Sequence, residues 1–332
     1  MKKRVLAIVT GLFLAGGIVF AQATADVTLT DVINEFNAGV ESLNGQSYET
    51  ALTQFNNCLA LCNQVGDEAT DMKKQAEEQV VGTHYRQAMT LMKRKQYDKA
   101  LPSLENTVNL SAEYEVMPEY AEKAARYLPP LYLREGNVLL KQEKYDEAMT
   151  TFDKVLAMEP ENYKAHQGKG LVYKEKGDID AMLEEFDVAK TKAAEENDAE
   201  FINDINAAIN DHYRGLIEKE LMMMDTEDPD YTFLLDICDE AIAANDKNSY
   251  AYWQAAAAKN KEIEYDAAIS YAEKAVAYET DPVLLSALYF ELGNAYQNTA
   301  RYEDACDALN KVTEEPFLSK AEKKISSVPN CN

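Results

Sequence analysis

Apolar residues along this chain of 332 residues recur at intervals of three, four and seven positions, with polar residues between them. Segment 129–162 shows the pattern clearly, because two apolar stripes flank the polar turn Gln142-Glu143-Lys144 and Pro160 closes the segment. The stripes are Tyr132, Gly136 and Leu139 before the turn and Tyr145, Ala148, Phe152 and Val155 after it. Such spacing predicts two amphipathic helices joined by a short turn.

The start of the second helix carries a signature that recurs along the chain: tyrosine, an acidic residue, any residue and alanine. Copies begin at Tyr48, Tyr97, Tyr145, Tyr265 and Tyr302, with their alanines at Ala51, Ala100, Ala148, Ala268 and Ala305. A weaker copy begins at Ile179, 34 residues after Tyr145, and Tyr231 stands 34 residues before Tyr265. A short pattern that recurs at this period predicts a stack of helical hairpins.

A second recurring slot, nine positions before the tyrosine, is mostly occupied by small residues. Its occupants are Gly39, Ala88, Gly136, Gly170, Met222, Ala256 and Gly293. Glycine inside a helix costs about 1 kcal/mol relative to alanine. We therefore expect another helix to pass close to this slot, with the signature alanine allowing the same approach from the partner helix.

These slots resemble those of the tetratricopeptide repeat family, and the resemblance runs from about Asp31 to Lys320. It implies an all-α, right-handed superhelical solenoid of about seven helix-turn-helix repeats, some with lengthened helices. The expected repeats span about 32–65, 81–114, 129–162, 163–196, 215–248, 249–282 and 286–319. The copy at Tyr231 is degenerate, and Pro102 is expected to kink the second helix of its repeat.

Three of the intervals between tyrosines carry about 14 to 18 extra residues, near 66–80, 115–128 and 197–214. These stretches are rich in Ala, Glu and Lys, which predicts lengthened second helices or added helical turns rather than linkers. No stretch has the composition of a domain boundary. We therefore expect a single solenoid over 26–320, followed by a polar C-terminal tail at 321–332.

The first 25 residues have the pattern of a signal peptide. Lys2, Lys3 and Arg4 precede an apolar run, and small residues follow from Ala21 to Ala25. The alternative is an uncleaved membrane anchor, but the run of about 16 residues is short for a bilayer span of roughly 20. We expect an exported protein, in the periplasm of a Gram-negative bacterium or secreted, with no stable membrane insertion after cleavage.

The net charge of −25 makes nucleic acid an unexpected partner, because an acidic chain repels phosphates. Cys306 and Cys331 are a candidate disulfide that would hold the C-terminal tail to the last helical pair. No cysteine has a histidine neighbour at zinc spacing, and the acidic segment 225–230 lacks the central glycine and final glutamate of a calcium loop. We expect no metal, no cofactor and no catalytic residues, since no catalytic motif is present.

In the family that the chain resembles, the first helices of successive repeats line a concave groove, and the slot twelve positions before the tyrosine faces it. Here the slot holds Phe36, Tyr85, Leu133, Gln167, Lys219, Trp253 and Phe290. A carboxylate clamp would need a basic residue there and an asparagine four positions later. Lys219 is followed by Met223, whereas Asn137 and Asn294 follow Leu133 and Phe290, so the clamp is not predicted.

An aromatic groove suits a peptide with apolar anchors, and Trp253, the only tryptophan, is the strongest candidate for contact. The alternative is that these rings pack between neighbouring repeats. The predicted partner-binding residues are Phe36, Tyr85, Leu133, Gln167, Trp253, Phe290, Asn137 and Asn294.

The sequence favours a non-catalytic, exported scaffold or adaptor that binds another envelope protein or peptide through this groove. The alternative is a small-molecule or glycan receptor of the envelope with a similar repeat core. That alternative would typically need a lipidation cysteine and long insertions outside the repeats, which the chain lacks.

Overall fold

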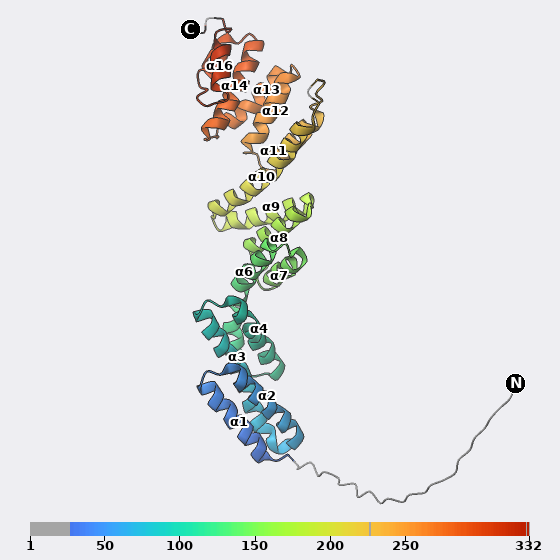
Figure 1. Ribbon diagram of the computed structural model, residues 1–332, viewed down its shortest axis with the longest axis vertical. Helices are drawn as coiled ribbons and strands as arrows, with labels where there is room; N and C mark the ends of the chain where they lie inside the picture. The colour runs from blue at the N-terminus through green and yellow to red at the C-terminus, as the bar shows by residue number, and fades with distance from the viewer. Residues whose placement is uncertain (1–26, 226, 330, 332) are drawn as a thin grey trace, which may run out of the picture. The chain divides into compact units, whose positions relative to one another are not determined.

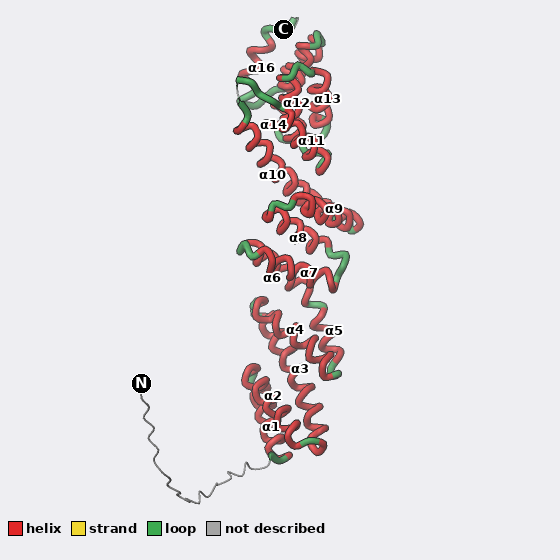
Figure 2. The backbone as a smooth tube through the Cα atoms, turned by 90° about the vertical axis from the view of Figure 1, so that its right-hand side faces the viewer, coloured by secondary structure: helices red, strands yellow, loops and turns green. Residues whose placement is uncertain are grey.

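The computed structural model describes residues 27–225, 227–329 and 331, and the expected signal peptide at 1–25 lies outside them. The described residues form helices, turns and loops, and none of them lies in a strand (Figure 2). No helix among them is both long and apolar enough to cross a membrane. The chain divides after Leu128 into two compact units (Figure 1).

The first unit consists of two helical hairpins and a short fifth helix. Its elements are α1 (Leu29–Asn44), α2 (Tyr48–Val65), a 3-10 turn (Asp67–Ala69), α3 (Thr70–Lys93), α4 (Tyr97–Tyr114) and α5 (Pro118–Ala125). Consecutive helices pack against each other. Helix α4 continues through Pro102, whose ring is exposed.

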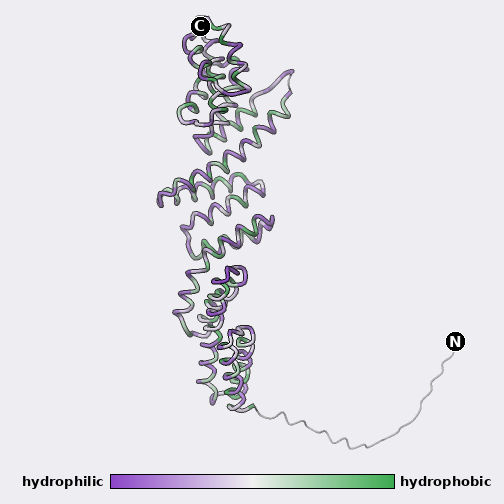
Figure 3. Tube along the Cα trace, turned by 60° about the vertical axis from the view of Figure 1, so that its left-hand side comes forward, coloured by the Kyte–Doolittle hydropathy of each residue, from purple (hydrophilic) through white to green (hydrophobic). Residues whose placement is uncertain are grey.

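The second unit continues the helical pairs from α6, which starts at the boundary. Its helices are α6 (Leu128–Lys141), α7 (Tyr145–Met158), α8 (Tyr163–Lys176), α9 (Ile179–Glu195), α10 (Ala199–Met223), α11 (Thr232–Ala244), α12 (Ser249–Lys261), α13 (Tyr265–Val276), α14 (Pro282–Asn298), α15 (Tyr302–Leu309) and α16 (Leu318–Ile325). Green and purple stretches alternate along these helices, as expected for amphipathic elements (Figure 3).

Each signature tyrosine begins a helix, and the preceding turn has a recurring backbone conformation. The residue two positions before it has a positive φ at Gln46, Lys95, Glu143, Gly177, Ile263 and Ala300. The next N–H then bonds back to a carbonyl five residues earlier, as Lys144 does to Leu139 at 3.0 Å. This is the Schellman arrangement that ends a helix. Only one of the six positions is glycine, which explains why the sequence pattern does not show it.

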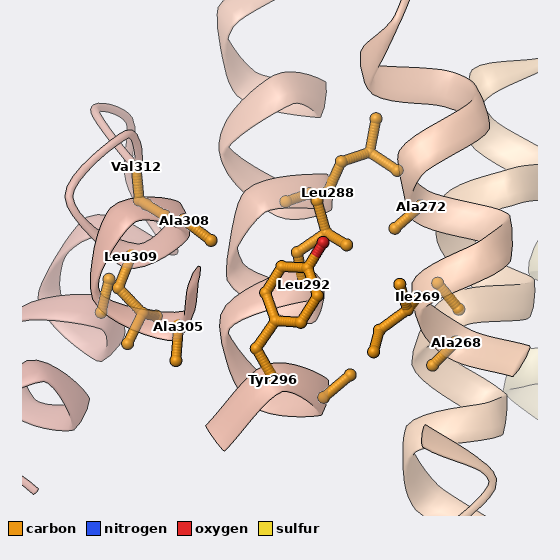
Figure 4. Close-up of a cluster of buried hydrophobic side chains, with 14 of the residues drawn as sticks. Ala268, Ile269, Ala272, Leu288, Leu292, Tyr296, Ala305, Ala308, Leu309 and Val312 are labelled. Atoms are coloured by element: carbon orange, nitrogen blue, oxygen red, sulfur yellow. The ribbon is translucent and has the colours of Figure 1, made fainter. Parts of the chain in front are cut away.

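The glycine slot is filled by a ring from the second helix. A methyl group built on Gly136 would lie 2.6 Å from Cε1 of the buried Phe152, and one built on Gly168 in the next hairpin would lie 2.4 Å from Cζ of the same ring. Gly39 with Phe55 and Gly170 with Phe186 repeat the arrangement. The signature alanines are buried as well, as Figure 4 shows for Ala268 and Ala305.

The inserted residues form added helical turns, one of the two predicted arrangements, rather than lengthened second helices. They form helix α5 and extend two first helices, α3 and α10, which are 24 and 25 residues long. In the degenerate copy at Tyr231, the residue aligned with the glycine slot is not buried. Met222 is 79% exposed at the end of α10, and Ile217, Tyr213 and Ile209 supply the buried face of that helix instead.

The segment after the last hairpin is partly helical and packed. Ala321 of α16 and Val328 are buried in the same cluster as Leu292 and Leu309. Cys331 forms a disulfide with Cys306 of α15, with a Cα–Cα distance of 5.5 Å. The backbone N–H groups of Thr313 and Glu314 donate to the hydroxyl of Ser286 in α14. The residues expected to form a polar tail therefore fold against α14 and α15.

Candidate functional site

The two predicted groove residues of the first unit pack within it. The Phe36 ring lies 5.7 Å from that of Phe55, and Tyr85 stacks on Tyr120 of α5 with centroids 4.8 Å apart and planes at 11°. Both groove residues are half-buried. The inserted helix α5 therefore covers the face that Tyr85 presents.

In the first hairpins of the second unit, the groove positions Leu133 and Gln167 are half-buried like Phe36 and Tyr85. Leu133 lines a shallow cavity of about 440 Å³ together with Pro130, Pro160 and Tyr163. Gln167 is half-buried on α8, and Asn137 is exposed on α6. These residues do not gather into one site with the later groove positions.

The last two groove aromatics meet a residue that the sequence pattern did not indicate. Phe317, which immediately precedes α16 and is 8% exposed, lies 5.6 Å from Trp253 of α12 and 5.9 Å from Phe290 of α14, measured between ring centroids. Phe317 thus brings Trp253 and Phe290 into one aromatic cluster, which is built from two repeats and the C-terminal segment.

An open cavity of about 420 Å³ adjoins this cluster. Its wall consists of Arg214, Tyr250, Trp253, Glu279, Asp281, Val283, Leu284, Ala287 and Phe317. We call it the Trp253 cavity. It lies within the second unit, and Val283 at its edge is 47% exposed.

The rings of the Trp253 cavity stand nearly perpendicular to one another. Tyr250 and Trp253 make an interplanar angle of 81° with centroids 5.5 Å apart, and Trp253 and Phe317 make an angle of 88°. Edge-to-face packing of this kind fixes ring positions. The cavity therefore has a preformed aromatic wall, and Leu284 and Ala287 of α14 add aliphatic surface.

The polar groups of the cavity are already engaged by the protein. The Arg214 guanidinium lies 4.6 Å from the centroid of Tyr250. One oxygen of Asp281 accepts the Leu284 N–H at 2.8 Å as the N-cap of α14, and Glu279 accepts the N–H groups of Thr280 and Asp281. These carboxylates hold the turn before α14, and the aromatic and aliphatic side chains form the rest of the wall.

Two features give the aromatic cluster a distinctive chemistry. The indole Nε1 of Trp253 is buried and has no hydrogen-bond partner. Burial raises the pKa of the Tyr250 phenol and the nearby Glu218 carboxylate raises it further, and the Tyr250 hydroxyl donates to that carboxylate at 3.5 Å.

Asn294, predicted as a groove residue, belongs to a polar network beneath α16. Asn260 donates to the Glu291 carboxylate at 2.7 Å, and Asn294 donates to the same oxygen at 3.4 Å. Burial raises the pKa of Glu291 despite these donors, and burial lowers the pKa of Lys324 on α16. The network holds helices α12 and α14 together, so Asn294 has a structural partner.

The described part of the chain offers no cluster of three or more His, Cys, Asp or Glu side chains placed to hold a metal ion. Burial lowers the pKa of both His84 and His212, which favours their neutral forms. Cys58 and Cys238 are buried free thiols, and burial raises the pKa of each to about 12. Such thiols resemble small apolar core residues rather than nucleophiles.

Sequence reasoning named Trp253 as a candidate contact residue, but it did not indicate most of the cavity that lies around it. Tyr250 stands three residues before Trp253, so helical spacing could have placed it on the same face. Phe317 and Arg214 have no such signal. Phe317 stands at the closing position that Pro160 has in its repeat, where the pattern predicts no aromatic ring, and Arg214 lies in an inserted stretch.

Comparison with known protein families matches two stretches of the chain. Tetratricopeptide-repeat family models match residues 133–197 and 286–315, which include Leu133, Gln167, Phe290 and Asn294. No curated protein sequence matches the chain.

Several solved repeat structures align with the chain at low identity. The TPR2AB domain–pHSP90 complex of yeast Sti1 is 15% identical, covering 91% of this chain and 98% of its own, with a TM-score of 0.35. YrrB, a TPR protein with an unusual peptide-binding site, is 20% identical, covering 58% of this chain and 91% of its own, with a TM-score of 0.30. A thermophilic TPR protein of Thermus thermophilus, TTC0263, is 20% identical, covering 60% of this chain and 98% of its own, with a TM-score of 0.26.

Proposed function

We propose that this chain, which carries tetratricopeptide repeats, is a non-catalytic scaffold that holds another protein by an apolar side chain seated in the Trp253 cavity. Tetratricopeptide-repeat proteins act as protein-interaction scaffolds, so the family supports the general role. The observation that carries the specific proposal is the preformed wall of Tyr250, Trp253 and Phe317.

The size and chemistry of the cavity fit a peptide anchor. Ligand pockets typically have volumes of about 300 to 1,000 Å³, so a cavity of about 420 Å³ accepts one or two large side chains. Aromatic walls are typical of the positions that contribute most binding energy at interfaces.

We further propose that the scaffold works outside the cytoplasm, in the cell envelope. The support is the N-terminal sequence, with Lys2, Lys3 and Arg4 before an apolar run and small residues at 21–25. The Cys306–Cys331 disulfide is consistent with an oxidising compartment.

The proposal is tested by replacing Val283, on the exposed edge of the cavity, with a photo-crosslinking amino acid. The matched control carries the same replacement at Val138 of α6. Both positions are 43 to 47% exposed. We expect a specific protein adduct from position 283 in intact cells and none from position 138. Identifying the adduct by mass spectrometry names the partner.

Substitutions at the cavity then establish whether it causes the capture. Trp253→Ala should weaken partner binding by tenfold or more, because a central aromatic anchor is worth about 2 kcal/mol or more. Val283→Glu should also weaken partner binding, and it should leave the thermal unfolding curve unchanged. Val138→Glu should change neither partner binding nor the unfolding curve. If Trp253→Ala unfolds the protein and Val283→Glu leaves partner binding intact, the Trp253 ring belongs to the hydrophobic core and does not contact a partner. Saturable binding of oligosaccharides in calorimetry would instead favour a glycan receptor.

A further inference from the structure

A second surface of the chain, separate from the Trp253 cavity, exposes large apolar side chains. Leu221, Met222 and Met223 end α10 and are 38%, 79% and 63% exposed, and Phe233 in the first turn of α11 is 60% exposed. We call these four residues the Met222 patch. The two helices pack against each other, and the turn between them projects from the second unit (Figure 1).

The repeat architecture does not account for this exposure. In other hairpins the slot of Met222 holds a glycine or alanine that is buried beneath the second helix, as Gly136 is beneath Phe152. Here α10 packs through Ile217 and residues before it, so its last turn extends beyond the buried interface. Three consecutive apolar residues are therefore presented to solvent, which is unusual unless they bind something.

The surroundings of the Met222 patch are strongly acidic. Residues 215–240 contain nine Asp and Glu residues and one lysine, a net charge of −8. Asp225, Glu227, Asp228 and Asp230 are exposed in the turn. The contacts of Asp225 and Asp230 are local, because each accepts a backbone N–H two residues later. An apolar centre is thus bordered by uncompensated negative charge.

We propose that the Met222 patch binds a basic amphipathic helix of a partner protein. The apolar stripe of such a helix would cover Met222, Met223 and Phe233, and its Lys or Arg residues would face the acidic turn. Methionine side chains adapt to different apolar shapes, which suits a surface that receives a helix. Opposite charges bordering an apolar contact set orientation and speed association.

The same charges argue against two other occupants. In a symmetric dimer, two copies of the patch would bring two regions of net charge −8 together, which is repulsive. An anionic membrane surface would be repelled for the same reason. A cationic partner helix is the occupant that satisfies both the apolar centre and the acidic border.

The test uses a fluorescein-labelled 18-residue Leu/Lys amphipathic peptide as the probe, with fluorescence anisotropy as the readout. The matched peptide with Glu in place of every Lys is the charge control. We expect the Leu/Lys peptide to bind the full chain at 0.05 M NaCl, and the Leu/Glu peptide not to bind. The Kd of the Leu/Lys peptide should rise with salt as the charges are screened.

The contribution of the apolar centre of the Met222 patch is tested with the triple variant Met222→Ser/Met223→Ser/Phe233→Ser. This variant should raise the Kd of the Leu/Lys peptide by tenfold or more. The control Ile33→Ser/Val138→Ser/Met158→Ser changes three other helical apolar residues that are 40 to 43% exposed and should leave the Kd unchanged. The charge part is tested with Asp225→Asn/Glu227→Gln/Asp228→Asn, which should raise the Kd several-fold and reduce its salt dependence. Val283→Glu should have no effect, which separates this surface from the Trp253 cavity.

Three results would overturn the proposal: equal binding of the Leu/Glu peptide, an unchanged Kd in the Met222 triple variant, or an equal loss in the control triple variant. Sedimentation velocity, which measures self-association, supplies a fourth test. Self-association that the Met222 triple variant abolishes would show that a second copy, not a basic helix, covers the patch.

Discussion

At the residue scale, the most telling contact is between Phe152 and two glycines. The ring inserts between Gly136 on α6 and Gly168 on α8, and a methyl group on either would lie 2.6 Å or less from a ring carbon. Phe152 is fully buried and cannot turn aside. One aromatic side chain therefore sets the spacing of three helices, both within its own hairpin and to the next one.

This contact predicts that Gly168→Ala destabilises the protein by about 2 kcal/mol, because overpacking of a rigid site outweighs the better helix propensity of alanine. Gly215→Ala is the matched control, since Gly215 lies inside α10 with nothing within 4 Å of an added methyl group. It should stabilise the helix by about 1 kcal/mol. Urea unfolding followed by circular dichroism measures both. Equal shifts in the same direction would contradict the packing argument.

At the element scale, the C-terminal segment determines the form of the candidate site. Phe317 contacts Trp253 and Phe290. The Ser286 hydroxyl accepts two backbone N–H groups from the connector between α15 and Phe317. The Cys306–Cys331 disulfide joins the end of the segment to α15. Helix α16 has only eight residues and could not persist alone. Its position thus depends on these tertiary contacts.

Removing the disulfide with Cys306→Ser/Cys331→Ser should loosen this segment. The two cysteines are 25 residues apart, and closing a loop of that length is worth about 3 kcal/mol. We expect the amides of α16 to exchange with deuterium faster, while those of α8 keep their protection. Unchanged exchange in α16 would show that Phe317 and Ser286 hold the segment without the covalent link.

At the scale of the whole molecule, charge is the dominant feature. The net charge is −25, and ion pairs such as Lys169 with Asp153 at 3.1 Å and Glu185 at 2.9 Å compensate only part of the acidity locally. Self-repulsion of this size disfavours the folded state, although it keeps the chain in solution.

Screening should therefore stabilise the protein. Raising NaCl from about 0.01 to 0.1 M shortens the Debye length from about 30 to 10 Å, and we expect the Tm at pH 7 to rise by a few degrees. KCl should act equally, whereas sorbitol at the same osmolality should reproduce little of the shift. A Tm that falls with salt would mean that ion pairs outweigh the repulsion.

Most of the helical architecture could be predicted because its signals lie within single hairpins. The signature tyrosines mark observed helix starts, and the glycine at 136 predicted a close approach. The inserted residues add helical turns, which was one of the two predicted arrangements, but those at 66–80 and 197–214 extend the following helix, since helix-forming residues can extend either neighbour. The packing of Ala76 and Ile205 placed them in the first helices.

The candidate site could be predicted only in part. Trp253 and Phe290 occupy the slot that the repeat pattern indicated, but that slot also holds Phe36 and Tyr85, which pack within the first unit. The slot alone does not distinguish an open position from a covered one. That distinction depends on α5 and on the segment after α15, neither of which carries a repeat signature.

The sequence by itself determined that the chain folds as tetratricopeptide-like helical hairpins, because helix periodicity, turn position and close-packing residues are local properties. The tertiary structure alone decided which surfaces stay open. Phe317 reaches Trp253 across 64 residues, and the last turn of α10 leaves Met222 uncovered since its hairpin closes earlier along the helix. Contacts between distant segments follow from packing, and packing is not encoded in the period of the repeat.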